Sequence, residues 1–298
     1  MDSQMESTCA EWCRSHYWQL QEKRGWRYSF HESVMVRYYE EANLDPTLLE
    51  PLVEFLKGDG WQGCFTVHNK PMDMGGWKTR DGRRVKQGMV FRGQGLNDNS
   101  VNGDAKGRNR LMVEDVDFFV NTLGVKTDLD LRSGRELAGM TQSPLGPGVK
   151  LIHHPSSAYN GIFKQNADYL SSSGMKTMAA NFRVFCDEKN YPIYFHCIGG
   201  ADRTGSLAYV LNGVLGVDKH DLETDWEATF YPSLPELEKG YNGPTYWRRE
   251  QYFDEGFAKY GDADTPWNKR IELYLLDCGV TPEEIEKFRS IMLEPRQH

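Results

Sequence analysis

Apolar positions follow two different spacings along the chain after about residue 65. Short continuous apolar runs predict buried strands, and longer segments with apolar residues every three or four positions predict amphipathic helices. The predicted strands are residues 89–92, 125–131, 149–153 and 192–196, and the predicted helices are residues 113–123, 133–138, 175–187 and 203–215. This alternation predicts an α/β fold, with a mainly parallel central sheet flanked by helices.

Residues at the ends of these segments support the predicted helices. Gly124 and Gly216 each follow a predicted helix, at a position that favours glycine. Beyond about residue 220 the pattern predicts helices only. The last helix begins with a threonine N-cap, a proline and a capping glutamate: Thr281-Pro282-Glu283-Glu284.

The first 64 residues have a different character. Residues 9–57 follow a mixed helical spacing with five aromatic residues between Trp12 and Tyr28, and glycines at 58, 60 and 63 then break the pattern. Aromatic residues at this density predict a packed segment rather than a free tail. We therefore expect a helical extension over residues 1–64, packed on a main domain over residues 65–298.

Composition and charge exclude several classes of protein. Of the 298 residues 39% are apolar and 26% charged, the ordinary balance of a globular chain with a sizeable core. No run approaches ~18 uninterrupted apolar residues, so we expect no membrane-spanning helix. The net charge of −8 argues against a general nucleic-acid binder and mildly against adhesion to anionic membranes. Met1 to Arg14 lack a secretory signal core, but a signal already removed would leave no trace, so the compartment is open, cytoplasmic by default.

The cysteines indicate neither a disulfide framework nor a zinc site. No two of the six form a C-x-x-C pair, and their share of the chain is low for a disulfide-stabilised protein. We expect five of them to be free thiols that serve packing: Cys9, Cys13, Cys64, Cys186 and Cys278.

The sixth cysteine, Cys197, begins the loop that carries the chemistry. The backbone amides of a tight glycine-containing loop, together with a helix N-terminus, bind an oxyanion and stabilise a thiolate, so Cys197 is a candidate nucleophile. Arg203, six residues later, can reach back to two phosphate oxygens. The segment reads His196-Cys197-Ile198-Gly199-Gly200-Ala201-Asp202-Arg203-Thr204-Gly205.

This segment resembles the signature of the cysteine-dependent phosphatases: His-Cys, five residues, Arg, then Ser or Thr. With Asp before the Arg and Thr-Gly after it, it is similar to the bacterial tyrosine phosphatase family that includes lipid and dual-specificity members. The resemblance covers about residues 70–293. It includes Asp73-Met74-Gly75-Gly76-Trp77, Val90-Phe91-Arg92-Gly93, Asp128-Leu129-Asp130-Leu131-Arg132-Ser133 with Glu136, and the helices from Tyr274-Leu275 to Phe288.

The resemblance implies a cysteine-phosphatase fold and hydrolysis of phosphomonoesters, with phosphotyrosine first, through a Cys197 thiophosphate. Arg203 and the amides of the loop hold the phosphate oxygens, so the reaction needs no metal or other cofactor. It also implies that Thr204 hydrogen-bonds the sulfur. His196 is expected to fix the loop and not to act as a base. The loop residues expected to contact substrate are His196, Ile198, Gly199, Gly200, Ala201 and Thr204.

The general acid has two candidates. Asp202 precedes the arginine and either caps the following helix or protonates the leaving oxygen. The segment after the strand ending at residue 153, which supplies the acid in many relatives, contains no aspartate here, and this favours Asp202. His154 in that segment stays open as a proton donor.

Other polar residues lie at strand ends, where sites of α/β proteins gather. Asp130 and Arg132 lie at the carboxyl end of one strand, and we interpret Arg132 as the structural partner of Glu136, four residues later. Arg92 is open to either a structural or a functional role.

Substrate preference follows from a departure from the family. Relatives often carry lysine where this chain has Ala201, which favours a singly phosphorylated group over polyphosphorylated inositols. An Asp81-Gly82 turn between extended runs predicts a hairpin. Its basic residues either replace the positive charge of the lysine that is absent at position 201 or are simply solvated. Tyr159 and Phe163 are candidates for a lid over an aromatic substrate or for ordinary packing. The basic residues of the hairpin are Lys78, Arg80, Arg83, Arg84 and Lys86.

Three other functions stay open: an inositol phosphate or phosphoinositide phosphatase, a non-catalytic phosphate-binding module, and a sulfurtransferase. The Arg203-Thr204-Gly205 ending argues against the last of these. In a chain this acidic, the positive potential for binding a phosphorylated substrate must be concentrated at Arg203 and the loop amides. The sequence predicts no oligomeric state.

Overall fold

The computed structural model describes residues 71–96, 111, 113–137, 139–156, 172–200, 202–228 and 250–296. The predicted extension over residues 1–64 lies outside these ranges, as do Ala201, Tyr159 and Phe163. In the described part, five strands form one sheet in the order β1-β2-β5-β3-β4. The strands are β1 (Met72–Asp73), β2 (Val90–Gly93), β3 (Thr127–Asp130), β4 (Lys150–His153) and β5 (Ile193–His196).

The sheet is mainly parallel, as the sequence predicts. Strands β2, β5, β3 and β4 run parallel, and only β1, a two-residue strand that the pattern did not predict, is antiparallel to its neighbour. The central strand β5 is buried along its whole length between β2 and β3. A continuous apolar run suits this position, because helices cover both faces of a parallel sheet.

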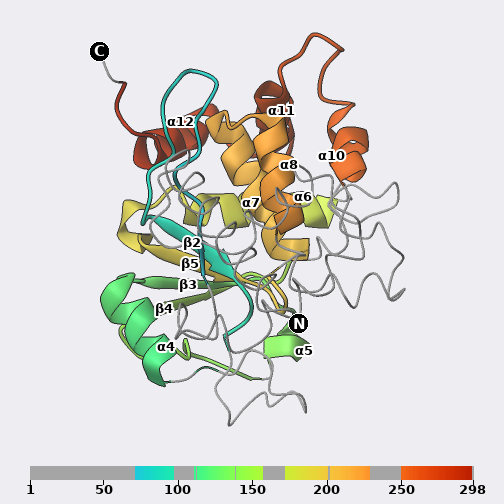
Figure 1. The fold of residues 1–298 in the computed structure, drawn as a ribbon. Coiled ribbons are helices and arrows are strands. Elements are labelled where there is room, and N and C mark those ends of the chain that lie inside the picture. Colours follow the sequence, from blue (N-terminus) through green and yellow to red (C-terminus); the bar gives the residue numbers. More distant parts are fainter. Residues whose placement is uncertain are drawn as a thin grey trace, which may run out of the picture.

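The two faces of β5 contribute to two separate cores. Ile193 and Phe195 lie in the larger core with the helices that follow the strands, whereas Tyr194 joins a smaller core with Phe91 and Phe119. This division follows the alternation of side chains along a strand. In Figure 1 the larger core lies between the sheet and the upper group of helices, and the smaller one lies on the side of α4.

The upper layer contains the helices of the second half of the chain (Figure 1). The central one, α7, is buried at every residue after Asp202, which fits a helix that is apolar on nearly all sides. It ends at Gly216, whose φ of +96° suits glycine. The helices are α6 (Ser172–Val184), α7 (Asp202–Leu215), α8 (Lys219–Ala228), α10 (Glu250–Phe257), α11 (Trp267–Asp277) and α12 (Pro282–Met292).

The segment predicted as one helix over residues 113–123 has two parts. An α-helix, α4 (Val113–Asp117), continues directly into a wider π-helical turn, η3 (Phe118–Thr122). The amide of Leu123 donates to the carbonyl of Phe118, five residues back, at 2.9 Å. The helix predicted over residues 133–138 is the short α5 (Gly134–Leu137).

The predicted hairpin forms at the far end of α7 from the cysteine. Lys78 and Arg84 make an antiparallel bridge around the turn, and the amide of Arg80 donates to the carbonyl of Gly216, just beyond α7. Cys197 lies before the opposite end of this 14-residue helix, so the two regions are separated by roughly 21 Å of helix. The basic hairpin therefore does not supply positive charge at the cysteine loop. This corrects the alternative in which its basic residues replace the charge of the lysine that is absent at position 201.

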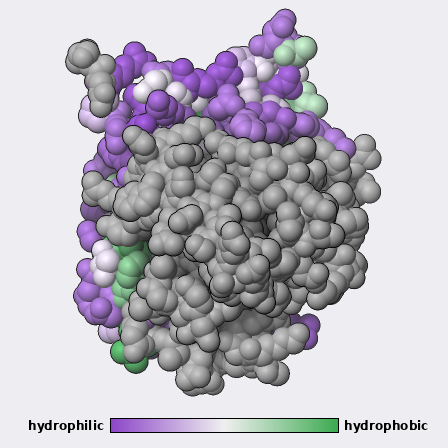
Figure 2. Space-filling view, viewed as in Figure 1, coloured by the Kyte–Doolittle hydropathy of each residue, from purple (hydrophilic) through white to green (hydrophobic). Residues whose placement is uncertain are grey.

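Along the upper edge in Figure 2, over α11, α12 and the hairpin, the surface of the described residues is mostly hydrophilic. Only Val113 and Ile198 are large hydrophobic residues with exposed side chains among those that the structure describes. No helix in the same part of the chain is long and apolar enough to cross a membrane.

Candidate active site

Cys197 lies at the carboxyl end of the central strand, directly before the loop that leads to α7. Its side chain is 3% exposed, whereas Ile198 and Gly199 beside it are exposed. Neighbouring strand ends hold the loop on two sides: the amide of Leu131 donates to the carbonyl of His196 at 2.8 Å, and the amide of Gly95 donates to the carbonyl of Ile198 at 2.9 Å. The chain thus positions the thiol from both β3 and β2.

The two glycines of the loop meet different requirements. Gly200 has a φ of +73°, and a Cβ atom there would lie 2.6 Å from the carbonyl carbon of Gly93 on β2, so no other residue fits without a shift. Gly199 is exposed, and a side chain there would meet nothing nearby. Neither glycine donates its amide N–H to another residue that the structure describes. These two donors next to Cys197 suit a bound oxyanion.

Arg203 occupies the first turn of α7 with its side chain only 4% exposed. The guanidinium of Arg203 makes a bidentate ion pair with the carboxylate of Glu136 on α5: Nη1 donates to Oε2 at 2.7 Å and Nη2 donates to Oε1 at 2.9 Å. Burial by itself would raise the pKa of Glu136, but Arg203 and hydrogen bonds from Ser133 lower it to about 2. The pair is therefore ionised at any ordinary pH, and the plane of the guanidinium is fixed.

This pairing corrects the predicted contact between Arg132 and Glu136. Arg132 instead binds Asp130, two residues before it, with Nη2 donating to Oδ2 at 2.6 Å and Nε donating to Oδ1 at 3.0 Å. Both side chains are buried, and Arg132 also donates to the carbonyl of Leu96 at 3.3 Å. The helical spacing between residues 132 and 136 fails as a guide because α5 begins only at Gly134.

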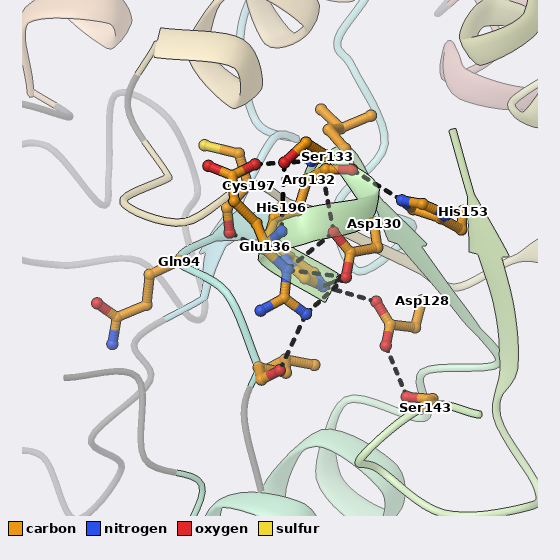
Figure 3. Close-up of polar contacts among 12 residues, drawn as sticks. Gln94, Asp128, Asp130, Arg132, Ser133, Glu136, Ser143, His153, His196 and Cys197 are labelled. Atoms are coloured by element: carbon orange, nitrogen blue, oxygen red, sulfur yellow. Dashed lines mark hydrogen bonds and ion pairs between the residues drawn. The ribbon is translucent and has the colours of Figure 1, made fainter. Parts of the chain in front are cut away.

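Beneath the loop, His196 is buried between two carboxylates. Its Nε2 lies 2.9 Å from Oδ1 of Asp128 and 3.9 Å from Oδ2 of Asp130, and Asp128 in turn accepts a hydrogen bond from the hydroxyl of Ser143 at 2.7 Å. Figure 3 shows this chain of contacts running from Ser143 to His196, with the Asp130–Arg132 pair beside it. The strand register brings these residues together, because Asp130 lies opposite His196.

The two carboxylates decide the charge of His196. Burial disfavours the imidazolium, but the negative charges of Asp130 and Asp128 outweigh that cost and raise the pKa of His196. Both ring nitrogens of the charged form are donors: Nε2 donates to Asp128, and Nδ1 donates to the carbonyl of Cys197 at 3.1 Å. His196 therefore binds the backbone carbonyl of the cysteine, a contact that the predicted fixing role requires.

Two further predicted residues lie in the first turn of α7. Thr204 is fully buried, and its hydroxyl makes no hydrogen bond within the described residues, so the predicted contact with the Cys197 sulfur is not formed. Asp202 is the first residue of the helix and is half-buried. Its position is compatible with both of its predicted roles.

The remaining candidates lie in the supporting structure. His154 follows β4, is half-buried, and places Nδ1 3.2 Å from Oδ1 of Asn181; burial lowers its pKa. Arg92, on β2, is 1% exposed, and its Nη2 lies 2.8 Å from the carbonyl and 3.0 Å from the carboxylate of Asp225, which marks it as a structural link to α8.

Three residues around the site have partners that the sequence does not predict. Glu136 was assigned to the wrong arginine, although Ser133-Gly-Arg-Glu136 has the spacing of a capping box, which places the glutamate at a helix start. Asp128 and Asp130 were not connected with His196. Their two-residue spacing on a strand next to β5 puts both on one face and was the available signal.

The comparisons with known proteins agree with this geometry. Residues 72–294, about three quarters of the chain, match the tyrosine phosphatase family, and the chain belongs to that family. It is accordingly a phosphoric monoester hydrolase. No curated protein matches the chain.

Solved structures similar to this chain include two of the catalytic core of Siw14. One, of the PP-IP phosphatase Siw14 from S. cerevisiae with citrate, is 16% identical, covers 48% of this chain and 72% of its own, and has a TM-score of 0.32. The other is 15% identical, covers 59% of this chain and 81% of its own, and has a TM-score of 0.35.

Proposed function

We propose that this tyrosine phosphatase family member hydrolyses phosphomonoesters through a covalent intermediate on Cys197, and that phosphotyrosine is its preferred substrate group. The observation that carries the proposal is that one strand–loop–helix turn has a buried cysteine at its start and a buried arginine at its end. The amides of Gly199 and Gly200 lie between them. A thiolate and a fixed array of donors are the two requirements for transfer of a phosphoryl group without a metal.

In the first step the Cys197 thiolate attacks phosphorus, a sulfur–phosphorus bond forms, and the bond from phosphorus to the leaving oxygen breaks. Arg203 and the loop amides bind the remaining phosphate oxygens. Since Glu136 fixes the guanidinium before substrate arrives, little reorganisation is required in the transition state. The leaving oxygen takes its proton from a general acid.

Asp202 is the better candidate for that acid. His154 is disfavoured because burial lowers its pKa, which disfavours the protonated form that a general acid needs. Asp202 is partly accessible at the start of α7, in the same loop as the nucleophile.

In the second step water attacks phosphorus, the sulfur–phosphorus bond breaks, and inorganic phosphate leaves. The carboxylate of Asp202 takes the proton that water loses, which restores the acid. The buried hydroxyl of Thr204, which has no partner among the described residues, is available to hydrogen-bond the departing sulfur.

The preference for phosphotyrosine rests on the surroundings of the loop. Ile198 next to Cys197 is an exposed apolar side chain, 42% accessible, and suits contact with an aromatic leaving group. The basic hairpin lies at the opposite end of α7, so it offers no help with additional phosphates. An inositol phosphate or phosphoinositide is the alternative substrate class.

Kinetics with a substrate panel test the proposal. The purified enzyme should hydrolyse an aryl phosphate and a phosphotyrosine peptide with higher kcat/KM than phosphoserine peptides or inositol phosphates, and vanadate should inhibit it. Cys197→Ser should be inactive on every substrate. Activity in Cys197→Ser would contradict the nucleophile, and a preference for inositol phosphates would contradict the substrate class alone.

Asp202→Asn separates the two roles of this residue. A general acid matters most for poor leaving groups, so kcat should fall more with an alkyl phosphate than with an activated aryl phosphate. Equal losses on both substrates would instead assign Asp202 to capping α7.

A further inference from the structure

The carboxylate that pairs with Arg203 lies on a very short helix. Glu136 belongs to α5, which has only four residues, Gly134–Leu137. A helix of this length has almost no stability of its own, because forming its first turn fixes several residues in return for few hydrogen bonds. Whatever holds the start of α5 therefore also holds the carboxylate that orients Arg203.

Ser133 makes the contacts that hold this start. Its amide donates to Oε2 of Glu136 at 2.7 Å, and its hydroxyl accepts a hydrogen bond from the amide of Glu136 at 3.2 Å. Its carbonyl accepts from the amide of Leu137 at 2.9 Å. The same Oε2 atom of Glu136 accepts from Arg203. Ser133 thus touches both the backbone and the carboxylate of Glu136, and Figure 3 shows the two residues next to each other.

From these contacts we propose that Ser133 is a positioning residue for the oxyanion-binding arginine. It acts through Glu136: the capping box closes the first turn of α5, and the closed turn sets where the carboxylate meets the guanidinium. The proposal rests on the proposed function, since it presumes that Arg203 binds the phosphoryl group. Loss of the hydroxyl lets the first turn open, and Arg203 then occupies its binding orientation for only part of the time.

A second capping box in the same chain gives a matched control. Thr281 and Glu284 at the start of α12 make the same pair of contacts, at 3.2 and 2.9 Å, and Glu284 also accepts hydrogen bonds from an arginine, Arg183. Thr281→Ala removes the same kind of hydrogen bond at the start of an 11-residue helix that holds none of the proposed site residues. It therefore measures what losing a cap does by itself.

The test compares kcat/KM for an aryl phosphate, the inhibition constant of orthovanadate and the melting temperature of Ser133→Ala, Ser133→Thr and Thr281→Ala. Ser133→Ala should lose about fivefold in kcat/KM, with a parallel weakening of vanadate inhibition, since one capping hydrogen bond is worth ~1 kcal/mol. Ser133→Thr keeps the hydroxyl and should restore both. Thr281→Ala should lower only the melting temperature.

A second variant tests the route through α5. An added Cβ at Gly134 would meet nothing within 4 Å, and alanine favours helix more than glycine does. Gly134→Ala should therefore recover part of the activity that Ser133→Ala loses, and this double variant remains informative should the single one fold poorly. Equal kcat/KM and vanadate inhibition in Ser133→Ala and Thr281→Ala would overturn the inference. An inactive wild-type enzyme would instead contradict the proposed function.

Discussion

Two capping boxes in this protein use the same contacts with different consequences. In each, the hydroxyl of the capping residue accepts a hydrogen bond from the amide of a glutamate, and the carboxylate of that glutamate accepts one from the amide of the capping residue. The same carboxylate also forms an ion pair with an arginine. The Arg183–Glu284 pair is on the surface, with side chains 45% and 28% exposed, and it joins the end of α6 to α12. The Arg203–Glu136 pair is less exposed, at 4% and 23%, and its arginine lies in the first turn of the helix that follows Cys197.

The difference shows that the local motif does not specify the role. Both boxes follow the spacing Ser/Thr-x-x-Glu, and both carboxylates have lowered pKa values because an arginine and capping hydrogen bonds favour their charged forms. What separates them is the position of the arginine in the fold: one lies next to the cysteine loop and the other on the outer surface. The following variants test whether that position has the consequences we expect.

The largest effect is expected from the arginines. Arg203→Lys replaces the planar, bidentate guanidinium by a single ammonium group. It should lower kcat/KM by about a hundredfold to a thousandfold, the range for loss of one preorganised oxyanion donor. Arg183→Lys should change kcat/KM by less than about twofold, since exposed ion pairs contribute ~0–1 kcal/mol. Steady-state kinetics on an aryl phosphate measure both. Similar losses in the two variants would show that Arg203 has no special role.

A smaller effect is expected from the glutamates. Glu136→Gln keeps the shape of the side chain but removes the charge that fixes Arg203, and a guanidinium displaced by about 1 Å should lower kcat/KM by up to a hundredfold. Glu284→Gln should leave kcat/KM unchanged and reduce only the melting temperature. Full activity in Glu136→Gln would mean that the loop orients Arg203 without help from α5.

The smallest effect is on the pH dependence of folding. The pKa of Glu136 falls from 4.5 to about 2 in the folded protein, so its contribution to stability is complete above pH 4.5 and is lost as the pH falls through 2. Urea unfolding should show wild type more stable than Glu136→Gln near pH 5, with the difference shrinking as the pH falls toward 2. A difference that stays constant over this range would argue that the variant acts through packing instead of charge.

The fold was largely predictable because its signals are local. The apolar run before Cys197 fits a strand buried on both faces, and Gly124 and Gly216 end their helical segments with φ values of +68° and +96°. The π-helical turn after Asp117 was not predictable, since its hydrogen bonds differ from those of an α-helix by one residue and leave the apolar spacing nearly unchanged. The position of the basic hairpin depends on contacts with Gly216, far along the chain.

The site was predictable where one continuous segment supplies it, from His196 to Thr204. Its supporting residues come from other elements, and their pairing depends on which strand lies beside β5. Sequence spacing favoured Arg132 as the partner of Glu136, but Asp130 is closer to Arg132, and the fold brings Arg203 to Glu136 across 67 residues. Contacts between distant segments leave no periodic trace in a single sequence.

The central claim is that Cys197 becomes phosphorylated during turnover. Mixing the wild-type enzyme with an aryl phosphate, quenching with acid within the first turnovers and mapping the peptides by mass spectrometry should find one phosphoryl group on the peptide that contains Cys197. The same experiment with Cys197→Ser should find none there and no release of phosphate. Turnover by Cys197→Ser, or a phosphoryl group carried by another residue such as His154, would contradict the account.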